Sequence, residues 1–470
     1  MKRPSTSSGR ADLISFFRPV AHATPQRDVF LLLALALAAY ANAFQGTFQF
    51  DDYNVIVLNP HVQSLAAWWQ SMPGIRPLLK LSYALNISSG LGLFGFHLFN
   101  LALHGANGIL VYRVLRAFAR RAGMARHGVR AAWFAAALFV VHPINSEAVT
   151  YLSGRSMSLM TLFYLGSLLA YVRRAENGRG ARWLSPVLFA GALLVKESAV
   201  TLPLALLLWE ATDRARSNAV HPELVEGRTE SLAERQLWHW ALLAAGLVVI
   251  AASPTYRWML EASWSLHPLS DSLSAQPQAI LYLIGQALRI GALNADPALP
   301  WAASTLAQTA AVAAALLFGL TQLRRRPWLG FGLTWFFLQL LPTHTLWPRL
   351  DAVNERHFYL AGIGLFWLAG YAASRLAEYG NARWWRLPAL LLIAALALAT
   401  ELRNSVYRDE IAFWADVAAK APHNARAFNN LGYAYRQEGR IAEAESAYRR
   451  ALALDPENLR AAANLRALGQ

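Results

Sequence analysis

The chain has 470 residues, of which 56% are hydrophobic and only 15% are charged, and its formal net charge is +15. Because soluble domains carry about 25% charged residues, this composition excludes an ordinary soluble globule and indicates a membrane protein with many spans. Such an excess of arginine is typical of cytoplasmic loops, so we expect no nucleic-acid partner. The chain contains no cysteine, which excludes disulfides and thiolate chemistry.

Apolar segments long enough to cross a bilayer, about 17–25 residues or fewer where protein surrounds them, recur along the chain. The first follows a basic tail (residues 1–28), and we interpret it as a retained span because no cleavage site of small residues follows it. The run Ala279–Leu293 is interpreted as an interfacial or re-entrant helix, because counting it as a span would put Arg324–Arg326 on the outer side. About eleven spans are therefore expected, near Val29–Phe44, His97–Leu115, Ala131–Val141, Val149–Val172, Trp183–Val195, Val200–Trp209, Trp238–Ala252, Leu306–Leu323, Trp328–Leu341, Phe358–Ala373 and Pro388–Thr400.

Clusters of arginine predict how these spans are oriented. Because Lys and Arg are enriched in cytoplasmic loops, the N-terminus is expected inside and, with eleven spans, the C-terminus outside. The long polar segment 45–95 then lies on the outer side, where Trp68 and Trp69 suit a helix in the membrane interface. The low lysine content favours a bacterial inner membrane, whose outer side is the periplasm. The cytoplasmic clusters comprise Lys2, Arg3, Arg10, Arg18 and Arg27; Arg113, Arg116, Arg120, Arg121, Arg126 and Arg130; Arg173, Arg174, Arg179 and Arg182; and Arg324–Arg326.

The last part of the chain, Asn424–Gln470, is polar and helical in composition. Its spacing matches the 34-residue tetratricopeptide pattern, in which small residues let two antiparallel helices pack closely and proline ends the second. We therefore expect a repeat domain at 402–470 with one full repeat at 425–458. About three repeats are needed for stability, so this domain must dock on the membrane domain (29–401) or on a partner, on the same face as Asp51. The matching positions are Leu431-Gly432, Tyr435, Ala444, Tyr448, Ala451 and Pro456.

Charged and polar residues gather at the predicted outer ends of the spans. Asp51 and Asp52 follow the first span, and charge at the edge of a span is costly and usually functional. The alternatives are solvated loop acids, helix-end side chains that snorkel to the interface, and satisfied core histidines. Carboxylates suit a general base, and cations suit a lipid phosphate. The other residues in this group are His97, His104, His142, Glu147, Arg155, Lys196, Glu197, Glu355 and Arg356.

The order of these motifs along the chain resembles that of a known protein family. They are Phe50-Asp51-Asp52-Tyr53 with Asn59; Arg76-Pro77-Leu78; His97-Leu98-Phe99-Asn100 with His104; His142-Pro143 with Glu147-Ala148-Val149; Gly154-Arg155; Lys196-Glu197; and Glu355-Arg356-His357-Phe358-Tyr359-Leu360. Together with the repeat, they resemble the transmembrane and tetratricopeptide-repeat protein O-mannosyltransferases of the C-type glycosyltransferase superfamily, and their bacterial relatives. The resemblance covers about residues 29–470.

The resemblance implies an all-α fold, a polytopic bundle of membrane helices with its site in the outer loop 45–95. It implies a donor sugar, typically mannose, on a polyprenyl phosphate among the membrane lipids, and an acceptor protein bound by the repeat. Asp51 would be the general base, and Asp52 would orient the base or the acceptor. The short repeat array departs from animal relatives, which carry many repeats, and leaves the acceptor open. The donor phosphate would be bound by Arg76, Arg155, Lys196, Arg356 and His142, with His97, His104, Glu147, Glu197 and Glu355 in support.

We therefore predict an inverting glycosyltransferase that moves a hexose to an acceptor hydroxyl, with protein Ser/Thr as the expected acceptor. Because a phosphate is already a good leaving group, a positioned base and nearby cations suffice and no metal is required. Paired acids can also hold Mg²⁺ or Mn²⁺, in which case Asp51 and Asp52 would be the ligands. A membrane-anchored repeat scaffold is one alternative, although an anchor needs a single span. A transporter is another, although it predicts internal symmetry that the sequence lacks.

Overall fold

The computed structural model describes residues 25–174, 183–220, 231–266, 268–299, 302–343, 353–379 and 382–469. The predicted basic tail up to residue 24, and Arg179 and Arg182, lie outside these ranges. Within the described ranges every regular element is a helix and none is a strand. This confirms the prediction of an all-α fold.

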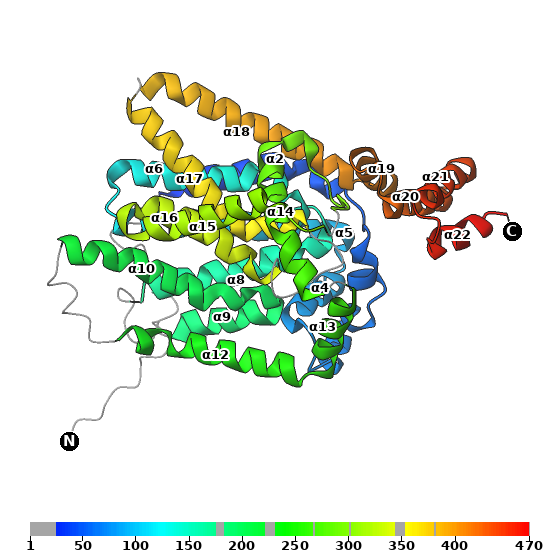
Figure 1. Cartoon of the computed structure of the whole chain (residues 1–470), viewed down its shortest axis with the longest axis horizontal. Coiled ribbons are helices and arrows are strands. Elements are labelled where there is room, and N and C mark those ends of the chain that lie inside the picture. The colour runs from blue at the N-terminus through cyan, green and yellow to red at the C-terminus, as the bar shows by residue number, and fades with distance from the viewer. Residues whose placement is uncertain are drawn as a thin grey trace.

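Among the described residues, eleven helices each overlap one of the predicted apolar segments and make up most of the body of the molecule (Figure 1). The agreement is least good for Val149–Val172, where a short helix (Ser146–Val149) and a turn precede a long helix that begins only at Arg155. The helices are α2 (Gln26–Tyr40), α5 (Gly92–Arg121), α6 (Ala125–Val141), α8 (Arg155–Val172), α9 (Leu184–Val195), α10 (Leu202–Val220), α12 (Leu232–Ala252), α15 (Leu306–Arg325), α16 (Pro327–Leu341), α17 (Phe358–Tyr379) and α18 (Ala382–Asn404).

Five helices in the described part of the chain are long and apolar enough to cross a membrane, and six if a pair bent by 55° at Pro143 is one span. They indicate an integral membrane protein, but they do not confirm the predicted number of eleven. One reason is that helices inside the bundle carry polar side chains, such as His97, Asn100, His104 and Asn107 of α5, which lower their hydropathy. The five are Gln26–Gln45, Leu232–Ala252, Leu306–Arg325, Glu355–Glu378 and Leu387–Tyr407.

Helix α17 packs closely against α6 and α16 because glycines let the helix backbones approach. A Cβ atom at Gly364 would collide with the carbonyl oxygen of Gly332 in α16, and one at Gly370 would collide with the carbonyl oxygen of Ala131 in α6. Aromatic rings fill the remaining space, as in the stacked pair Phe118–Phe331, whose centroids are 4.2 Å apart. These contacts fix α6, which leads to His142 and Glu147, and α17, which follows Glu355 and Arg356.

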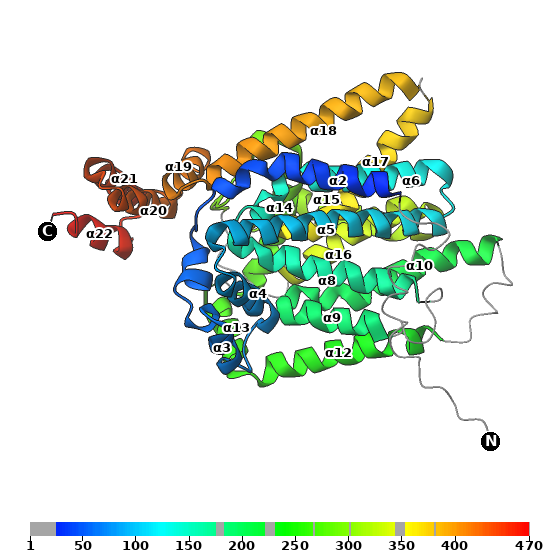
Figure 2. The same cartoon turned by 180° about the vertical axis from the view of Figure 1, so that it is seen from behind.

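The predicted outer loop and the C-terminal helices lie at one end of this body (Figure 2). The loop folds into α3 (Leu65–Gln70) and α4 (Pro77–Ser88), with α13 (Pro254–Leu266) beside them. The run Ala279–Leu293 falls largely within α14 (Leu269–Leu288). The C-terminal helices are α19 (Glu410–Lys420), α20 (Ala425–Gln437), α21 (Ile441–Leu454) and α22 (Leu459–Arg466).

The repeat helices dock on the bundle through polar contacts. Lys420 Nζ donates to the carbonyl oxygen of Leu293 over 2.8 Å, and the Asn424 amide donates to the carbonyl oxygen of Asp296 over 3.0 Å. Arg426 Nε lies 2.8 Å from Asp296 Oδ2. The repeat and Asp51 therefore share one end of the molecule, as the sequence predicts. The side of the membrane that this end faces stays a prediction.

Candidate active site

A narrow pocket lies at the seam between the bundle and the repeat helices. Asp51 comes from the loop after α2, Glu147 from the bend after α6, and Arg356 from the turn before α17. The pocket thus brings together three residues predicted from the sequence. The full lining is Phe50, Asp51, Glu147, Tyr151, Ala295, Asp296, Asn354, Arg356, Tyr407, Phe413, Trp414 and Arg426.

Asp52 turns inward and holds the loop. It is fully buried, and its Oδ2 accepts from the Gln49 backbone N–H (3.0 Å) while its Oδ1 accepts from that of Ser153 (2.7 Å). Burial raises the pKa of Asp52 to about 7, although both N–H groups favour the carboxylate. Asp52 therefore ties the loop to the turn before α8.

Asp51 turns toward the pocket. The preceding residue, Phe50, has φ of 41°, a left-handed conformation that is uncommon outside glycine. Asp51 and Asp52 follow it in one helical turn, in which successive side chains point in different directions. The Asp51 backbone N–H donates to the Tyr151 hydroxyl over 2.9 Å, and its side chain is 38% exposed. Between the two acids, Asp51 is the one that a substrate can reach.

Arg356 lies between two carboxylates. Its Nη2 is 3.8 Å from Asp51 Oδ2, and its Nε is 3.8 Å from Glu147 Oε1. Its backbone N–H donates to Glu147 Oε2 over 2.8 Å and also to the side chain of Asn354, which begins the turn. The hydrogen bonds of the Arg356 backbone therefore hold the turn from which the guanidinium extends. The distance of 3.8 Å between the guanidinium and the Asp51 carboxylate is long for an ion pair.

Arg76 forms a second charged cluster nearby in the outer loop. With φ of 51° it precedes Pro77 at the start of α4, and its Nη2 lies 2.7 Å from Glu197 Oε2. Its Nε lies 3.0 and 3.1 Å from the two oxygens of Glu197, and the Tyr256 hydroxyl donates to Oε1 over 3.0 Å. Although burial opposes it, the charge of Arg76 lowers the pKa of Glu197 to about 2.

Arg155 does not offer its charge to a substrate in this structure. It is fully buried, and its nitrogens donate to the Asn100 side chain (2.6 Å) and to the carbonyl oxygens of Ser82 and Phe96 (both 3.1 Å). Its guanidinium also lies 4.6 Å from the ring centroid of Phe99. In this structure Arg155 ties α4 and α5 to α8, and its role at the donor phosphate stays a prediction.

Lys196 and Glu355 are also buried. Lys196 Nζ lies 3.4 Å from Ser156 Oγ, and a carboxylate oxygen of Glu355 lies 3.5 Å from Arg403 Nη2. Neither residue lines the narrow pocket. Glu355 is nevertheless adjacent to Arg356, so its ion pair with α18 helps to hold the turn that carries Arg356.

The three predicted histidines connect helices within the bundle. Each is buried and bonds a backbone carbonyl through Nε2: His97 that of Gly46 (3.1 Å), His104 that of Val140 (3.0 Å) and His142 that of Ala287 (3.1 Å). A carbonyl oxygen can only accept, so each Nε2 carries the proton. Nδ1 also has a partner in His104, the Tyr359 hydroxyl, and in His142, the Ile144 N–H, whereas the buried Nδ1 of His97 has none in the described part of the chain. The narrow pocket is lined by none of the three rings.

Sequence reasoning missed the residues that the repeat and its connections contribute to the pocket. Trp414 packs edge-on against Phe50 with centroids 5.3 Å apart, and Arg426 pairs with Asp296. Tyr151 supplies the hydroxyl that receives the Asp51 N–H. A sequence signal for Trp414 and Arg426 does exist. A repeat that must dock on another domain is expected to carry cations or large aromatic side chains on its first helices.

The part of the chain that the structure describes holds no group of three or more His, Asp or Glu side chains placed to bind a metal. The two oxygens of Asp52 already accept backbone N–H groups. The geometry thus gives no support to a metal bound jointly by Asp51 and Asp52, and the expectation that no metal is required stays a prediction.

Comparison with known proteins agrees with this architecture. The tetratricopeptide repeat family matches residues 425–458. Protein O-mannosyl-transferase Tmtc3 of Drosophila melanogaster is 24% identical over 94% of this chain and 57% of its own length. The human protein O-mannosyl-transferases TMTC4 and TMTC1 are 26% and 27% identical over 85% and 93% of this chain, and 62% and 56% of their own. No solved structure matches.

The chain is thus related to the protein O-mannosyl-transferases of this group across most of its length, as the motifs predicted. It spans about 56–62% of the length of these three relatives.

Proposed function

We propose that the chain is a membrane glycosyltransferase that moves mannose or another hexose from a polyprenyl phosphate to a Ser or Thr hydroxyl of an acceptor protein. The observation that carries the proposal is an exposed carboxylate, Asp51, 3.8 Å from the cation Arg356 in a pocket that the repeat helices help to line. The names of the relatives, protein O-mannosyl-transferases, support the same activity.

Asp51 acts as the base in this mechanism. It takes the proton of the acceptor hydroxyl, whose oxygen attacks the anomeric carbon, and the bond from that carbon to the phosphate oxygen breaks with inversion. The electron pair leaves on the polyprenyl phosphate, whose charge Arg356 stabilises. A positioned base contributes about 10²–10⁴-fold, and a preorganised cation stabilises the charge that develops on the leaving group.

The membrane arrangement that goes with this activity has eleven spans, with the pocket and the repeat on the outer, periplasmic side of a bacterial inner membrane. Contacts between helix ends support it. The segment after α2 meets the start of α5 through Gly46 and His97, and the end of α18 meets the bend after α6 through Asn404 and Thr150. Such contacts are expected where consecutive helices alternate in direction.

Replacement of Asp51 by Asn tests the proposal. The chain is placed in lipid nanodiscs with polyprenyl-phosphate mannose and a pool of Ser- and Thr-containing peptides, and hexose addition is measured by mass spectrometry. We expect Asp51→Asn to lower transfer by about 10²-fold or more without lowering the melting temperature. The matched control is Asp271→Asn, on the exposed first turn of α14, which should transfer as the wild type does.

Full transfer by a folded Asp51→Asn variant would show that another group is the base. No transfer by the wild type from any polyprenyl-phosphate sugar would instead favour a non-enzymatic scaffold that displays the repeat.

A further inference from the structure

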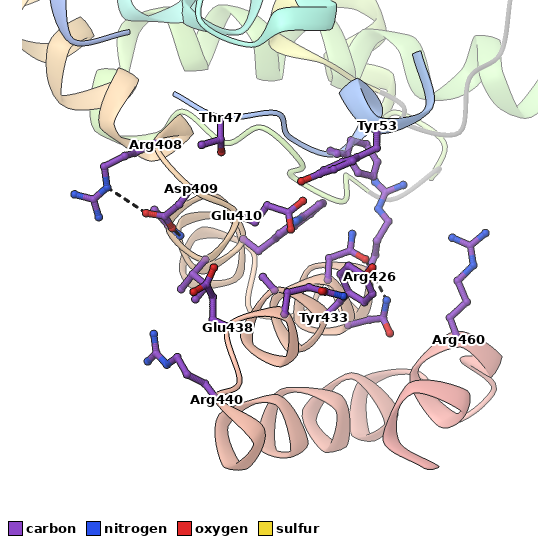
Figure 3. A pocket seen from close by; sticks show the side chains of 18 of the residues that line it. Thr47, Tyr53, Arg408, Asp409, Glu410, Arg426, Tyr433, Glu438, Arg440 and Arg460 are labelled. Atoms are coloured by element: carbon purple, nitrogen blue, oxygen red, sulfur yellow. Dashed lines mark hydrogen bonds and ion pairs between the residues drawn. The ribbon is translucent and has the colours of Figure 1, made fainter. Parts of the chain in front are cut away.

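A large cavity separates the repeat helices from the loop after α2 (Figure 3). Its volume is about 1300 Å³, beyond the roughly 300–1,000 Å³ of sites for small molecules. Tyr53 reaches toward Glu410 across it from the loop, and Tyr433 faces it from α20. The space is thus suited to a polymer that passes between two parts of the chain.

This cavity adjoins the pocket of Asp51. Phe50, Trp414 and Arg426 line both of them. Because Asp51 follows Phe50 directly, a chain lying in the large cavity needs to pass only the Phe50–Trp414 ring pair to bring a side chain to Asp51. The large cavity therefore lies next to the candidate base, with the Phe50–Trp414 ring pair between the two spaces.

The walls of the cavity combine apolar surface with acidic and basic side chains in nearly equal number. Amide side chains on α20, Asn430 and Gln437, carry both donors and acceptors, as a polypeptide backbone does. Asn429 is buried behind them, where its amide bonds to Asn430 and Asn464. Tyr53 and Tyr433 add rings that are 38% and 45% exposed. Most of the arginines on the wall are paired with an acid: Arg408 with Asp409, Arg426 with Asp296 and Arg440 with Glu443.

We propose that the large cavity binds an extended, uncharged segment of the acceptor polypeptide and guides its hydroxyl to Asp51. The proposal rests on the proposed function, and it adds the class of acceptor sequence and the residues that select it. Amides favour a backbone that both donates and accepts, and paired charges select neither acidic nor basic sequences. The concave surfaces of stacked repeats also suit extended partners.

Peptide binding without a sugar donor tests the proposal separately from transfer. The probe is a fluorescein-labelled pool of fifteen-residue peptides, with Thr at the centre and Ala, Gly, Ser and Asn elsewhere, added to the full chain in nanodiscs. Fluorescence anisotropy should show binding that Tyr433→Ala weakens by about tenfold, as expected for an exposed aromatic anchor. Gln437→Trp, which fills the cavity from the end of α20, should weaken it as well.

Three controls make the result specific. Ile441→Ala, on a 47% exposed side chain outside the cavity lining, should bind the peptides as the wild type does. Asp51→Asn should bind them equally well while failing to transfer. Pools in which Asp or Lys replaces the neutral residues should bind more weakly than the neutral pool.

Three results would overturn the proposal: no binding by the wild type, unchanged binding by Tyr433→Ala and Gln437→Trp, or binding of a mannose oligosaccharide in place of the peptides. Peptide binding that these variants abolish, in a wild type that transfers no sugar, would support the cavity and refute the glycosyltransferase. Sugar transfer by a wild type that binds none of the peptides would support the glycosyltransferase and refute the peptide-binding cavity.

Discussion

The ion pair between Arg76 and Glu197 stabilises the loop end of the bundle at neutral pH, and we expect this stabilisation to be lost at acidic pH. Three N–O contacts of 2.7–3.1 Å join the two side chains, and a hydroxyl hydrogen bond from Tyr256 adds a third segment. The Arg76 and Glu197 side chains are 28% and 17% exposed, so water screens their attraction only partly.

The size of the effect follows from the pKa of Glu197, which Arg76 lowers from 4.5 to about 2 against the opposing effect of burial. A carboxyl group whose pKa is lower in the folded state stabilises that state above its unfolded pKa, and this contribution is lost as the pH falls through the folded pKa. At about 1.36 kcal/mol for each pKa unit, the pair contributes about 3 kcal/mol above pH 5. The contribution disappears between about pH 4.5 and pH 2.

Thermal unfolding of Glu197→Gln at several pH values measures this contribution. Tryptophan fluorescence in nanodiscs should give a melting temperature well below that of the wild type at pH 7. The difference should shrink at pH 4 and fall to about a quarter at pH 2.5, because that pH is close to the folded pKa of about 2. Glu443→Gln, which removes the partner of Arg440 on the exposed start of α21, is the control and should show no such difference. An equal loss at pH 7 and pH 2.5 would refute the reasoning, because it would show that packing and not charge holds the cluster.

Two further substitutions separate support from chemistry. Asp52→Asn places an amide NH₂ against one of two buried backbone N–H donors. The free energy of unfolding should therefore fall by about 1–3 kcal/mol. An unchanged melting temperature would show that Asp52 does not hold the loop. Trp414→Leu removes the ring that packs on Phe50, so kcat for transfer should fall by about tenfold through misplacement of Asp51. A loss confined to KM would show that Trp414 serves only acceptor binding.

The helices and the repeat could be predicted from the sequence because their signals are local. A long apolar run in this chain forms a helix, and each of the eleven predicted segments overlaps a helix in the structure. The repeat is encoded in spacing: Gly432 must be small because a Cβ there would lie 2.7 Å from the ring of Tyr448 on the next helix. The boundary near Val149 was missed because Pro143 and Gly154 shape a bend through contacts that no local pattern contains.

The candidate site could be predicted only in part, because residue type near a helix end does not determine which way the side chain turns. Asp51, Glu147 and Arg356 meet in one pocket, whereas Arg155 is enclosed. The partners that enclose Arg155 come from residues 82–100, more than 50 positions earlier. Only the tertiary fold distinguishes a cation that a substrate can reach from one that ties helices together.

The docking of the repeat explains how a single full repeat persists in this chain, and it has a consequence for the site. The contacts that hold the repeat run through Asp296 and Arg426, which also line the pocket of Asp51. Arg403 adds an ion pair of 2.8 Å to Asp416 on α19 while it contacts Glu355, the neighbour of Arg356. Stability of the repeat and geometry of the pocket therefore depend on the same residues, so a change that loosens one will disturb the other.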